Sequence, residues 1–331
     1  MTLLHSVFLF FSTALVSFLT TGLILNILKH HDIVDNPNER SSHTKPTPRG
    51  GGLAVLLVSL GAWAFSQGDI FNIFQVLFIT TLFLGIISWI DDVHSLPASI
   101  RLLSQFLAVG FIFWLMPATN LYFHGFLPYW LDTLVAVFIW VWFINLFNFM
   151  DGIDGISVVE ASSIGLGIFI LTALGAIQLT NGFLGLVIAA STTGFVWWNW
   201  QPAKVFLGDV GSVPLGFLLG WLLLEILSTS HWPVAVILPL YYLADSSITL
   251  GCRIWRNKSI WQAHREHFYQ QATARGLSHA QVSSLILGAN ILLVGLSIFS
   301  LVHPLTALFC AFIVVSCLLL ILRGPKNGGI S

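Results

Sequence analysis

A run of polar residues closes a long apolar segment near the middle of the chain. Asn145, Asn148, Asp151 and Asp154 recur at every third position, and a glycine follows each aspartate. Residues three apart are neighbours on a helix surface, so this spacing predicts a short polar ladder. A charge at the bilayer centre costs about 2.5 to 3.5 kcal/mol, so we expect the ladder at the membrane interface or in a wet cleft. The alternative is a polar helix end that only marks the membrane surface.

Carboxylates gather in two further stretches. Asp91 and Asp92 stand side by side at the end of an apolar run, where adjacent negative charges repel unless a cation lies near them. Mg²⁺ or an arginine would relieve that repulsion, and simple solvation at the start of a loop is the alternative. Asp209 lies between two glycines just before another apolar run, which suits either a metal ligand on a tight turn or a helix N-cap.

A glycine-rich element follows the first apolar run. The sequence Pro-Arg-Gly-Gly-Gly occupies positions 48–52, and prolines keep the preceding stretch extended and non-helical. Because the glycines precede the second apolar run, we expect backbone N–H groups around Gly51 and a helix N-terminus to face an anion. An ordinary charged loop is the alternative.

The longest segment between apolar runs holds His264, Arg265 and His267. In the amphipathic helix expected over 261–269, the two histidines would share one face because they are three residues apart. Arginine and histidine side chains can bind phosphate oxygens. A helix that only lies on the bilayer surface is the alternative.

The composition places these polar residues in a membrane protein. Of the 331 residues, 56% are hydrophobic and only 8% are charged, which is outside the range of soluble globular domains. Runs long enough to cross about 30 Å of hydrocarbon predict an all-α polytopic protein with about eleven transmembrane helices in a single domain, residues 1–331. The expected spans are 3–28, 50–66, 71–90, 101–116, 130–147, 156–174, 181–198, 212–229, 232–250, 280–301 and 305–322.

The distribution of charge predicts an orientation. With the N-terminus outside and the C-terminus inside, all 13 lysines and arginines lie on the cytoplasmic side, 12 of them in the connecting segments and Arg101 at the first position of the span 101–116, as the positive-inside rule expects. Most of the acids lie on the same side, which that rule does not explain, so we expect one active face toward the cytoplasm. The expected cytoplasmic segments are 29–49, 91–100, 148–155, 199–211, 251–279 and the tail after 322.

These groups together indicate phosphate chemistry. Carboxylate oxygens favour Mg²⁺, with Mn²⁺ as the alternative, and Mg²⁺ usually binds one or two carboxylates together with substrate phosphates. A site embedded in a membrane is needed only if one substrate is a lipid. A secondary transporter is the rival hypothesis, but its acids should lie near the bilayer midplane. A non-catalytic scaffold of a glycan assembly complex would need no cluster of acids.

The chain resembles the polyprenyl-phosphate N-acetylhexosamine-1-phosphate transferase family, glycosyltransferase family 4, over nearly its whole length. Two departures from the common pattern are similar to the branch that initiates O-antigen and related surface glycans: Arg265 and Glu266 separate the histidines, and no lysine follows the aspartate pair closely. The motifs that carry the resemblance are 48–52, Asp91-Asp92, 145–155, 206–212 and 264–267.

The resemblance implies a multi-pass enzyme of the bacterial inner membrane. It would transfer an N-acetylaminosugar-1-phosphate from a UDP-sugar to undecaprenyl phosphate with Mg²⁺, releasing UMP. The identity of the sugar and the existence of a homodimer stay open. The implied catalytic residues are Asp91, Asp92, Asp151, Asp154 and Asp209, with Asp209 as the principal metal ligand and Asp91 or Asp92 as its helper. The implied substrate-binding residues are Lys45, Arg49, Gly51, Asn145, Asn148, Lys204, His264, Arg265 and His267.

Overall fold

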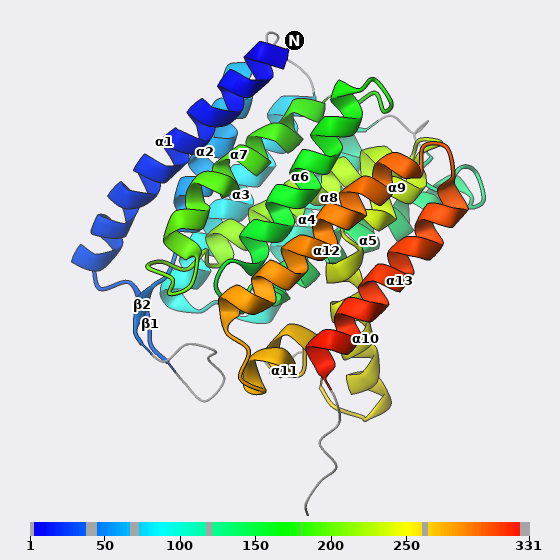
Figure 1. The fold of residues 1–331 in the computed structure, drawn as a ribbon. Helices are drawn as coiled ribbons and strands as arrows, with labels where there is room; N and C mark the ends of the chain where they lie inside the picture. Colours follow the sequence, from blue (N-terminus) through cyan, green and yellow to red (C-terminus); the bar gives the residue numbers. More distant parts are fainter. Residues whose placement is uncertain are drawn as a thin grey trace, which may run out of the picture.

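The computed structural model describes residues 3–37, 45–66, 73–116, 121–179, 181–259 and 264–324. These residues form a bundle of helices with one short antiparallel pair of strands at one end (Figure 1). The helices are α1 (Leu3–His30), α2 (Gly52–Ser66), α3 (Ile73–His94), α4 (Ala98–Leu115), α5 (Tyr129–Phe149), α6 (Ile156–Ala173), α7 (Gly182–Asn199), α8 (Asp209–Leu227), α9 (Trp232–Ile237), α10 (Leu240–Trp255), α11 (Phe268–Ala274), α12 (His279–Phe299) and α13 (Pro304–Arg323), and the strands are β1 (Val34–Asp35) and β2 (Thr47–Pro48).

The prediction of an all-helical polytopic membrane protein is confirmed. In the described part of the chain, eight helices are long and apolar enough to cross a membrane: α1, α3, α4, α5, α6, α8, α12 and α13. Helix α2 is a shorter apolar helix of 15 residues. The finer count of eleven crossings stays a prediction.

Three predicted boundaries are wrong, each for a local reason. Helix α3 continues through Asp91 and Asp92, and α4 begins at Ala98, so the predicted loop 91–100 shrinks to residues 95–97. Helix α8 begins at Asp209, because the Asp92 carboxylate accepts the backbone N–H groups that open this helix. The predicted span 232–250 is two helices, because Pro239 lacks the N–H that a continuous helix needs.

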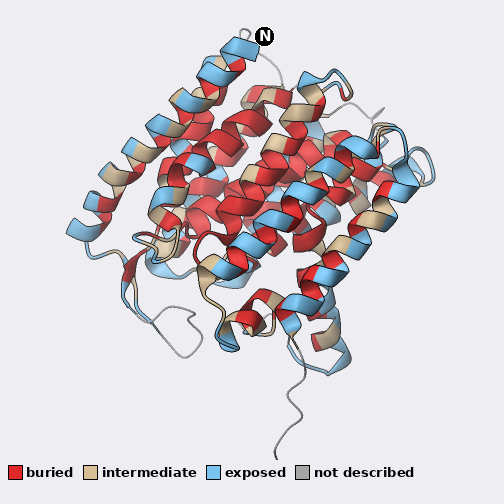
Figure 2. Ribbon diagram, in the orientation of Figure 1, coloured by how far each residue is buried: buried red, intermediate tan, exposed pale blue. Residues whose placement is uncertain are grey.

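Helix α8 forms the centre of the bundle. Of its span, 89% is buried, compared with 22% for α1, and Figure 2 shows buried residues concentrated in the inner helices. Helix α5 approaches α8 closely because Gly220 has no side chain: a Cβ there would lie 2.5 Å from the Trp140 ring. The start of α8, and therefore Asp209, is fixed by the core of the protein.

The outer helices carry large apolar side chains on their exposed faces. Examples are Phe8 and Phe11 on α1 and Phe309 on α13, each more than half exposed. In a soluble protein such faces would be a liability, but hydrocarbon solvates them. The strand pair and α11 lie at one end of the bundle, opposite the N-terminus of α1 (Figure 1).

Candidate active site

Three carboxylates and two arginines meet where α3, α4 and α8 come together; we call Arg49, Asp91, Asp92, Arg101 and Asp209 the carboxylate–arginine cluster. Arg49 reaches two acids, with Nε 2.7 Å from Oδ1 of Asp92 and Nη2 2.8 Å from Oδ1 of Asp209. Arg101 Nη1 lies 3.2 Å from Asp91 and 3.6 Å from Asp209. The structure therefore brings together acids that lie more than 110 positions apart in the sequence.

Asp92 holds the backbone of the cluster in place. Its two carboxylate oxygens accept the N–H groups of Asp209 and Val210, both at 3.0 Å, and its side chain is fully buried. Asp92 therefore caps α8 from another helix, and its Oδ1 also contacts Nε of Arg49. Asp91 differs from Asp92, because it contacts Arg101 and, among the described residues, accepts one backbone N–H group, that of Leu96.

The glycine-rich element has a different role from the predicted one. The N–H of Gly51 donates to the Phe206 carbonyl at 2.9 Å, and the N–H of Gly52 donates to that of Leu207 at 2.8 Å. These groups are engaged inside the protein, so the prediction that they face an anion is wrong. Gly52 instead permits a close approach, because a Cβ there would lie 2.3 Å from Cα of Gly211. This packing positions Arg49 against Asp209.

Arg49 remains charged although it is mostly surrounded by protein. Burial alone would lower its pKa, but the carboxylates of Asp209 and Asp92 raise the pKa of Arg49 well above its ordinary value. One third of its side chain is exposed, so the guanidinium is fixed by acids on one side and accessible on the other. Such a group can bind an incoming phosphate oxygen without first having to gain a proton.

The carboxamides of α5 extend the site. Asn148 Nδ2 donates to Asp209 at 3.0 Å and to the Ser212 hydroxyl at 2.8 Å, and Asn145 donates to Gln105 at 2.5 Å. A cavity of about 70 Å³ lies between α3, α4, α5 and α8. Its lining includes Asp91, Arg101, Asn145, Asn148 and Asp209.

The predicted polar ladder is not one continuous helix. Helix α5 ends at Phe149, so Asp151 and Asp154 lie in the turn that follows. Asp151 still senses the cluster: burial raises its pKa to about 7, a hydrogen bond with Ser157 opposes the rise, and the Asp209 charge adds to it. Asp151 can therefore change its charge close to neutral pH.

Asp154 lies in a different set of contacts. Its carboxylate accepts the N–H of Ala203 at 3.1 Å and lies 3.2 Å from Nδ1 of His279, so it ties the segment 200–204 to the start of α12. The Lys204 ammonium lies over the rings of Trp197 and Trp198, 4.9 and 5.1 Å from their centroids. Lys45 is exposed in the segment that leads into β2. The small cavity beside Asp209 is not lined by any of these three predicted site residues, Asp154, Lys204 and Lys45.

The histidine segment 264–267 precedes a helix instead of forming one. Helix α11 begins at Phe268, because Asp245 accepts the N–H groups of Phe268 and Tyr269 at 3.0 and 3.3 Å. The predicted helix over 261–269 is therefore wrong for 264–267, and residues 261–263 lie outside the described ranges. The rings of His264 and His267 nevertheless stack, with centroids 4.9 Å apart.

The histidine segment is fastened to the turn that carries Asp151. The Tyr269 hydroxyl donates to the Phe149 carbonyl at 3.2 Å, and a Cβ on Gly152 would clash with that hydroxyl. Burial, the neighbouring His267 and Arg253 lower the pKa of His264 to about 4. At neutral pH, His264 is therefore an uncharged hydrogen-bonding group.

Two members of the site were not among the predicted catalytic or substrate-binding residues, although Arg101 is the lysine or arginine nearest in sequence to Asp91 and Asp92. Arg101 belongs to the cluster, and its signal was the short, proline-terminated connection that places the start of α4 beside the end of α3. Tyr269 connects α11 to the Asp151 turn. The sequence signal for this contact is the glycine at position 152, where a side chain would clash with the Tyr269 hydroxyl.

The acids of the cluster suit a hard cation. In the described ranges, no group of three or more His, Cys, Asp or Glu side chains could hold a metal ion alone. The carboxylates of Asp91 and Asp209, however, both lie beside Nη1 of Arg101, at 3.2 and 3.6 Å, so two negative charges meet at one point, and a cation relieves such a juxtaposition. Because Mg²⁺ commonly takes one or two carboxylates and completes its shell with substrate phosphates, the residues fit Mg²⁺ bound together with a substrate.

Comparison with known proteins agrees with this chemistry. The sequence model described as "Glycosyl transferase family 4" matches residues 74–227. The probable undecaprenyl-phosphate N-acetylglucosaminyl 1-phosphate transferase of Bacillus subtilis is 31% identical over 287 residues, covering 80% of this chain and 77% of that protein. The undecaprenyl-phosphate alpha-N-acetylglucosaminyl 1-phosphate transferase of Thermotoga maritima is 30% identical, covering 61% and 60%. The phospho-N-acetylmuramoyl-pentapeptide-transferase of Enterococcus hirae is 30% identical, covering 62% and 68%.

Proposed function

Because the chain belongs to glycosyl transferase family 4, we propose that it transfers N-acetylglucosamine-1-phosphate from UDP-N-acetylglucosamine to undecaprenyl phosphate. The products are UMP and undecaprenyl-diphosphate-N-acetylglucosamine, the first lipid-linked intermediate of a cell-surface polysaccharide. The names of the relatives from Bacillus subtilis and Thermotoga maritima support this donor and this acceptor. The family resemblance noted in the sequence is confirmed by the same relatives.

The observation that carries the proposal is the carboxylate–arginine cluster at the helix ends. Asp91 and Asp92 lie in the last turn of α3, and Asp209 is the first residue of α8. A lipid phosphate at the membrane surface reaches helix ends without entering the hydrocarbon, as does a water-soluble nucleotide. The same placement disfavours the transporter hypothesis, which requires acids near the midplane.

The nucleophile needs little activation. The second pKa of a phosphate monoester is about 6, so the acceptor is already largely a dianion at neutral pH. One of its oxygens attacks the sugar-bearing phosphorus of the donor, and the bond between that phosphorus and the bridging oxygen breaks to release UMP. The main task of the protein is therefore to reduce repulsion and align the attacking and leaving oxygens.

The cluster divides this task among its members. Asp209 and Asp91 would hold Mg²⁺, which neutralises charge on the diphosphate when it is bound. Asp92, which accepts two backbone N–H groups of α8 and pairs with Arg49, keeps Asp209 in position instead of acting as a ligand. The exposed sides of Arg49 and Arg101 bind phosphate oxygens of the acceptor and the donor.

The donor is held by the other half of the site. Asn148 and Asp151 face the donor diphosphate from α5 and the turn after it, and the segment His264–His267 covers the nucleotide. Burial, followed by the neighbouring His267 and Arg253, keeps His264 neutral, so we assign it a hydrogen bond to a phosphate oxygen and leave the positive charge to Arg265. Asp154 supports this half by holding segment 200–204 and α12.

The proposal includes an orientation for the whole chain. Residues 1–331 form one transferase domain with eleven membrane crossings in a bacterial inner membrane, the N-terminus outside and the site facing the cytoplasm. The one-sided distribution of lysine and arginine supports this. A cysteine introduced at the exposed Ala274, with the three native cysteines replaced, should react with an impermeant reagent only after the cells are permeabilised. Labelling in intact cells would reject the orientation.

A direct assay tests the activity. The purified protein is incubated with UDP-N-acetylglucosamine, undecaprenyl phosphate and Mg²⁺, and both UMP release and a lipid-linked sugar are measured. We expect equal amounts of the two products and none without the acceptor. UMP formed without a lipid-linked sugar, or no product with active control enzyme present, would reject the proposed transfer.

A further inference from the structure

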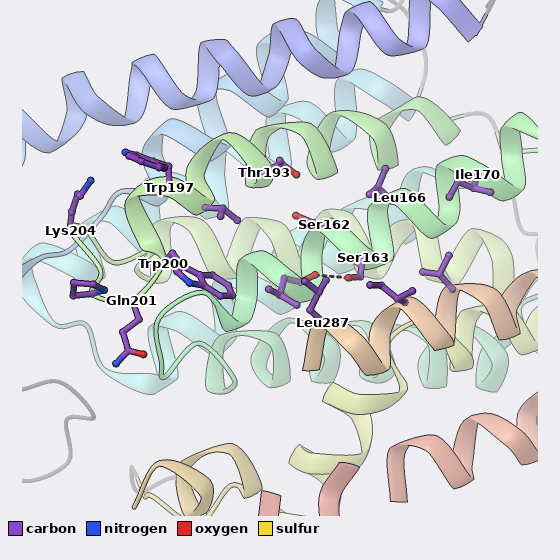
Figure 3. A pocket seen from close by; sticks show the side chains of 15 residues that line it. Ser162, Ser163, Leu166, Ile170, Thr193, Trp197, Trp200, Gln201, Lys204 and Leu287 are labelled. Atoms are coloured by element: carbon purple, nitrogen blue, oxygen red, sulfur yellow. Dashed lines mark hydrogen bonds between the residues drawn. The ribbon is translucent and has the colours of Figure 1, made fainter. Parts of the chain in front are cut away.

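A large groove lies outside the carboxylate–arginine cluster. It has a volume of about 880 Å³ and runs between α6, α7 and α12 (Figure 3). Its walls are mainly aliphatic and aromatic side chains such as Leu166, Leu287 and Ile291. None of the residues that line it also lines the small cavity beside Asp209. The groove is therefore separate from the small cavity of the carboxylate–arginine cluster.

The polar residues in the groove wall do not make it hydrophilic. Ser163 donates to the Val159 carbonyl at 2.8 Å, and Thr193 donates to the Ala189 carbonyl at 2.7 Å, both within their own helices. Ser162 and Thr192 pair with each other at 2.8 Å. Because these hydroxyl groups are satisfied by the protein, the groove presents a surface that suits a hydrocarbon chain.

One end of the groove differs from the rest. Lys204, Trp197 and Gln201 gather at this end, whereas Leu166 and Ile170 lie toward the other (Figure 3). The Lys204 ammonium lies over two indole rings, which hold the positive charge in place through cation–π contacts. Tryptophan and lysine at the end of an apolar surface are typical of the membrane–water interface. The groove is thus polar and cationic at one end and apolar along its length.

The length of the groove indicates what kind of chain fits. On α6 the lining runs from Val159 to Ile170, eleven steps along the helix, which corresponds to about 16 Å at 1.5 Å per residue. One leaflet of hydrocarbon is about 15 Å thick. An acyl chain of one leaflet matches this length, whereas the 55-carbon chain of undecaprenyl phosphate is much longer.

We propose that the groove binds an acyl chain of an anionic membrane phospholipid, with the lipid phosphate against Lys204. This site is separate from both substrates of the proposed transfer reaction. The bound lipid would contact the segment that Asp154 holds through the Ala203 N–H group. It would also cover Trp200, whose ring lies so close to Gly155 that a Cβ there would be 2.8 Å away. The lipid therefore supports the outer side of the Asp151–Gly155 turn.

Lipid retention tests the proposal without any measurement of transfer. The purified full-length protein, depleted of lipid in mild detergent, is mixed with phosphatidylglycerol or phosphatidylcholine of identical acyl chains, and bound lipid is counted by native mass spectrometry. We expect about fivefold stronger retention of phosphatidylglycerol, the factor expected from one lysine near an anionic lipid. Lys204→Ala should remove this preference, and Lys29→Ala, which removes an exposed positive charge at the end of α1, should not.

A second pair of variants separates loss of the groove from loss of the protein fold. Thr193→Trp and Ile291→Trp place a bulky ring in the groove from opposite walls and should each reduce retention of both phospholipids at least fivefold, while the elution volume and the melting temperature stay close to wild type. Equal retention of the two phospholipids, unchanged binding in Lys204→Ala, or displacement of phosphatidylglycerol by stoichiometric undecaprenyl phosphate would overturn the proposal. The outcome of the transferase assay does not depend on these lipid-binding results.

Discussion

The guanidinium of Arg49 donates to the Asp209 carboxylate at 2.8 Å across 160 positions of sequence. The pair joins the segment before α2 to the first residue of α8, and a parallel bridge between Arg49 and Phe206 aligns the two backbones. Asp209 is therefore positioned by a salt bridge and by a backbone contact at once. Asp209, the proposed metal ligand, and the positively charged Arg49, which we propose binds phosphate, therefore lie side by side.

Replacing Arg49 should mainly affect the chemical step. Arg49→Ala should reduce kcat by about 10²- to 10³-fold, the usual effect of removing one group that stabilises charge in a transition state. Arg49→Lys should restore only part of the rate, because a single ammonium cannot contact Asp92 and Asp209 with the planar fork of arginine. Steady-state kinetics at saturating concentrations of both substrates measures this effect. Wild-type kcat in both variants would remove Arg49 from the proposed mechanism.

Asp92 and Asp209 should respond differently to the same change. Asp209→Asn should lose activity by orders of magnitude with little change in melting temperature, because a carboxamide is a poor ligand for Mg²⁺. Asp92→Asn should lower the melting temperature as well, because one of its two oxygens becomes an NH₂ group that cannot accept an N–H from α8. The unmet hydrogen bond costs about 1–3 kcal/mol. Thermal unfolding in the same detergent distinguishes the two; equal melting temperatures would contradict the structural role of Asp92.

The sequence predicted the helices and the acids well but not their contacts. Hydrophobic runs gave the helices because each run must fill or cross an apolar layer, whatever its neighbours are. The different roles of Asp91 and Asp92 depend on which of two adjacent side chains faces the start of α8, more than 100 residues away. Lys204 and Asp154 lie in segments with clear motifs, yet their side chains face Trp197 and His279. Such directions are set by the packing of distant helices and leave no periodic signal.

Asp151 should give the reaction a pH dependence. Burial raises the pKa of Asp151 to about 7, so the side chain is mostly protonated at pH 6 and mostly ionised at pH 8. If the ionised form is the active one, kcat/KM should rise about tenfold between pH 6 and pH 8. His264 does not contribute in this range, because its pKa is about 4.

The ratio of wild-type to Asp151→Asn activity isolates this titration. The acceptor phosphate also ionises near pH 6, but its effect is the same for both proteins and cancels in the ratio. We expect the ratio to increase with pH and to level off above pH 8. A ratio that is constant from pH 6 to pH 8 would show that the Asp151 charge is not used.

Arg265 should act on the donor more than on the acceptor. The acceptor gains affinity from its buried hydrocarbon tail, whereas the UDP-sugar depends on polar contacts at the membrane surface. Arg265→Ala should therefore raise the KM for UDP-N-acetylglucosamine at least about tenfold, with a smaller change in the KM for undecaprenyl phosphate. Arg265→Lys should recover part of the loss. Varying each substrate in turn provides the measurement, and an effect confined to the acceptor would assign the segment His264–His267 to the membrane surface.

The fate of the sugar-bearing phosphorus tests the central claim most directly. UDP-N-acetylglucosamine labelled with ³²P only in that phosphate is mixed with undecaprenyl phosphate, Mg²⁺ and the purified protein, and the products are separated into lipid and nucleotide fractions. The proposed reaction transfers the phosphate together with the sugar, so all product label should appear in the lipid and the released UMP should be unlabelled. Label that leaves as UDP, with only the sugar on the lipid, would contradict transfer of a sugar phosphate by this site.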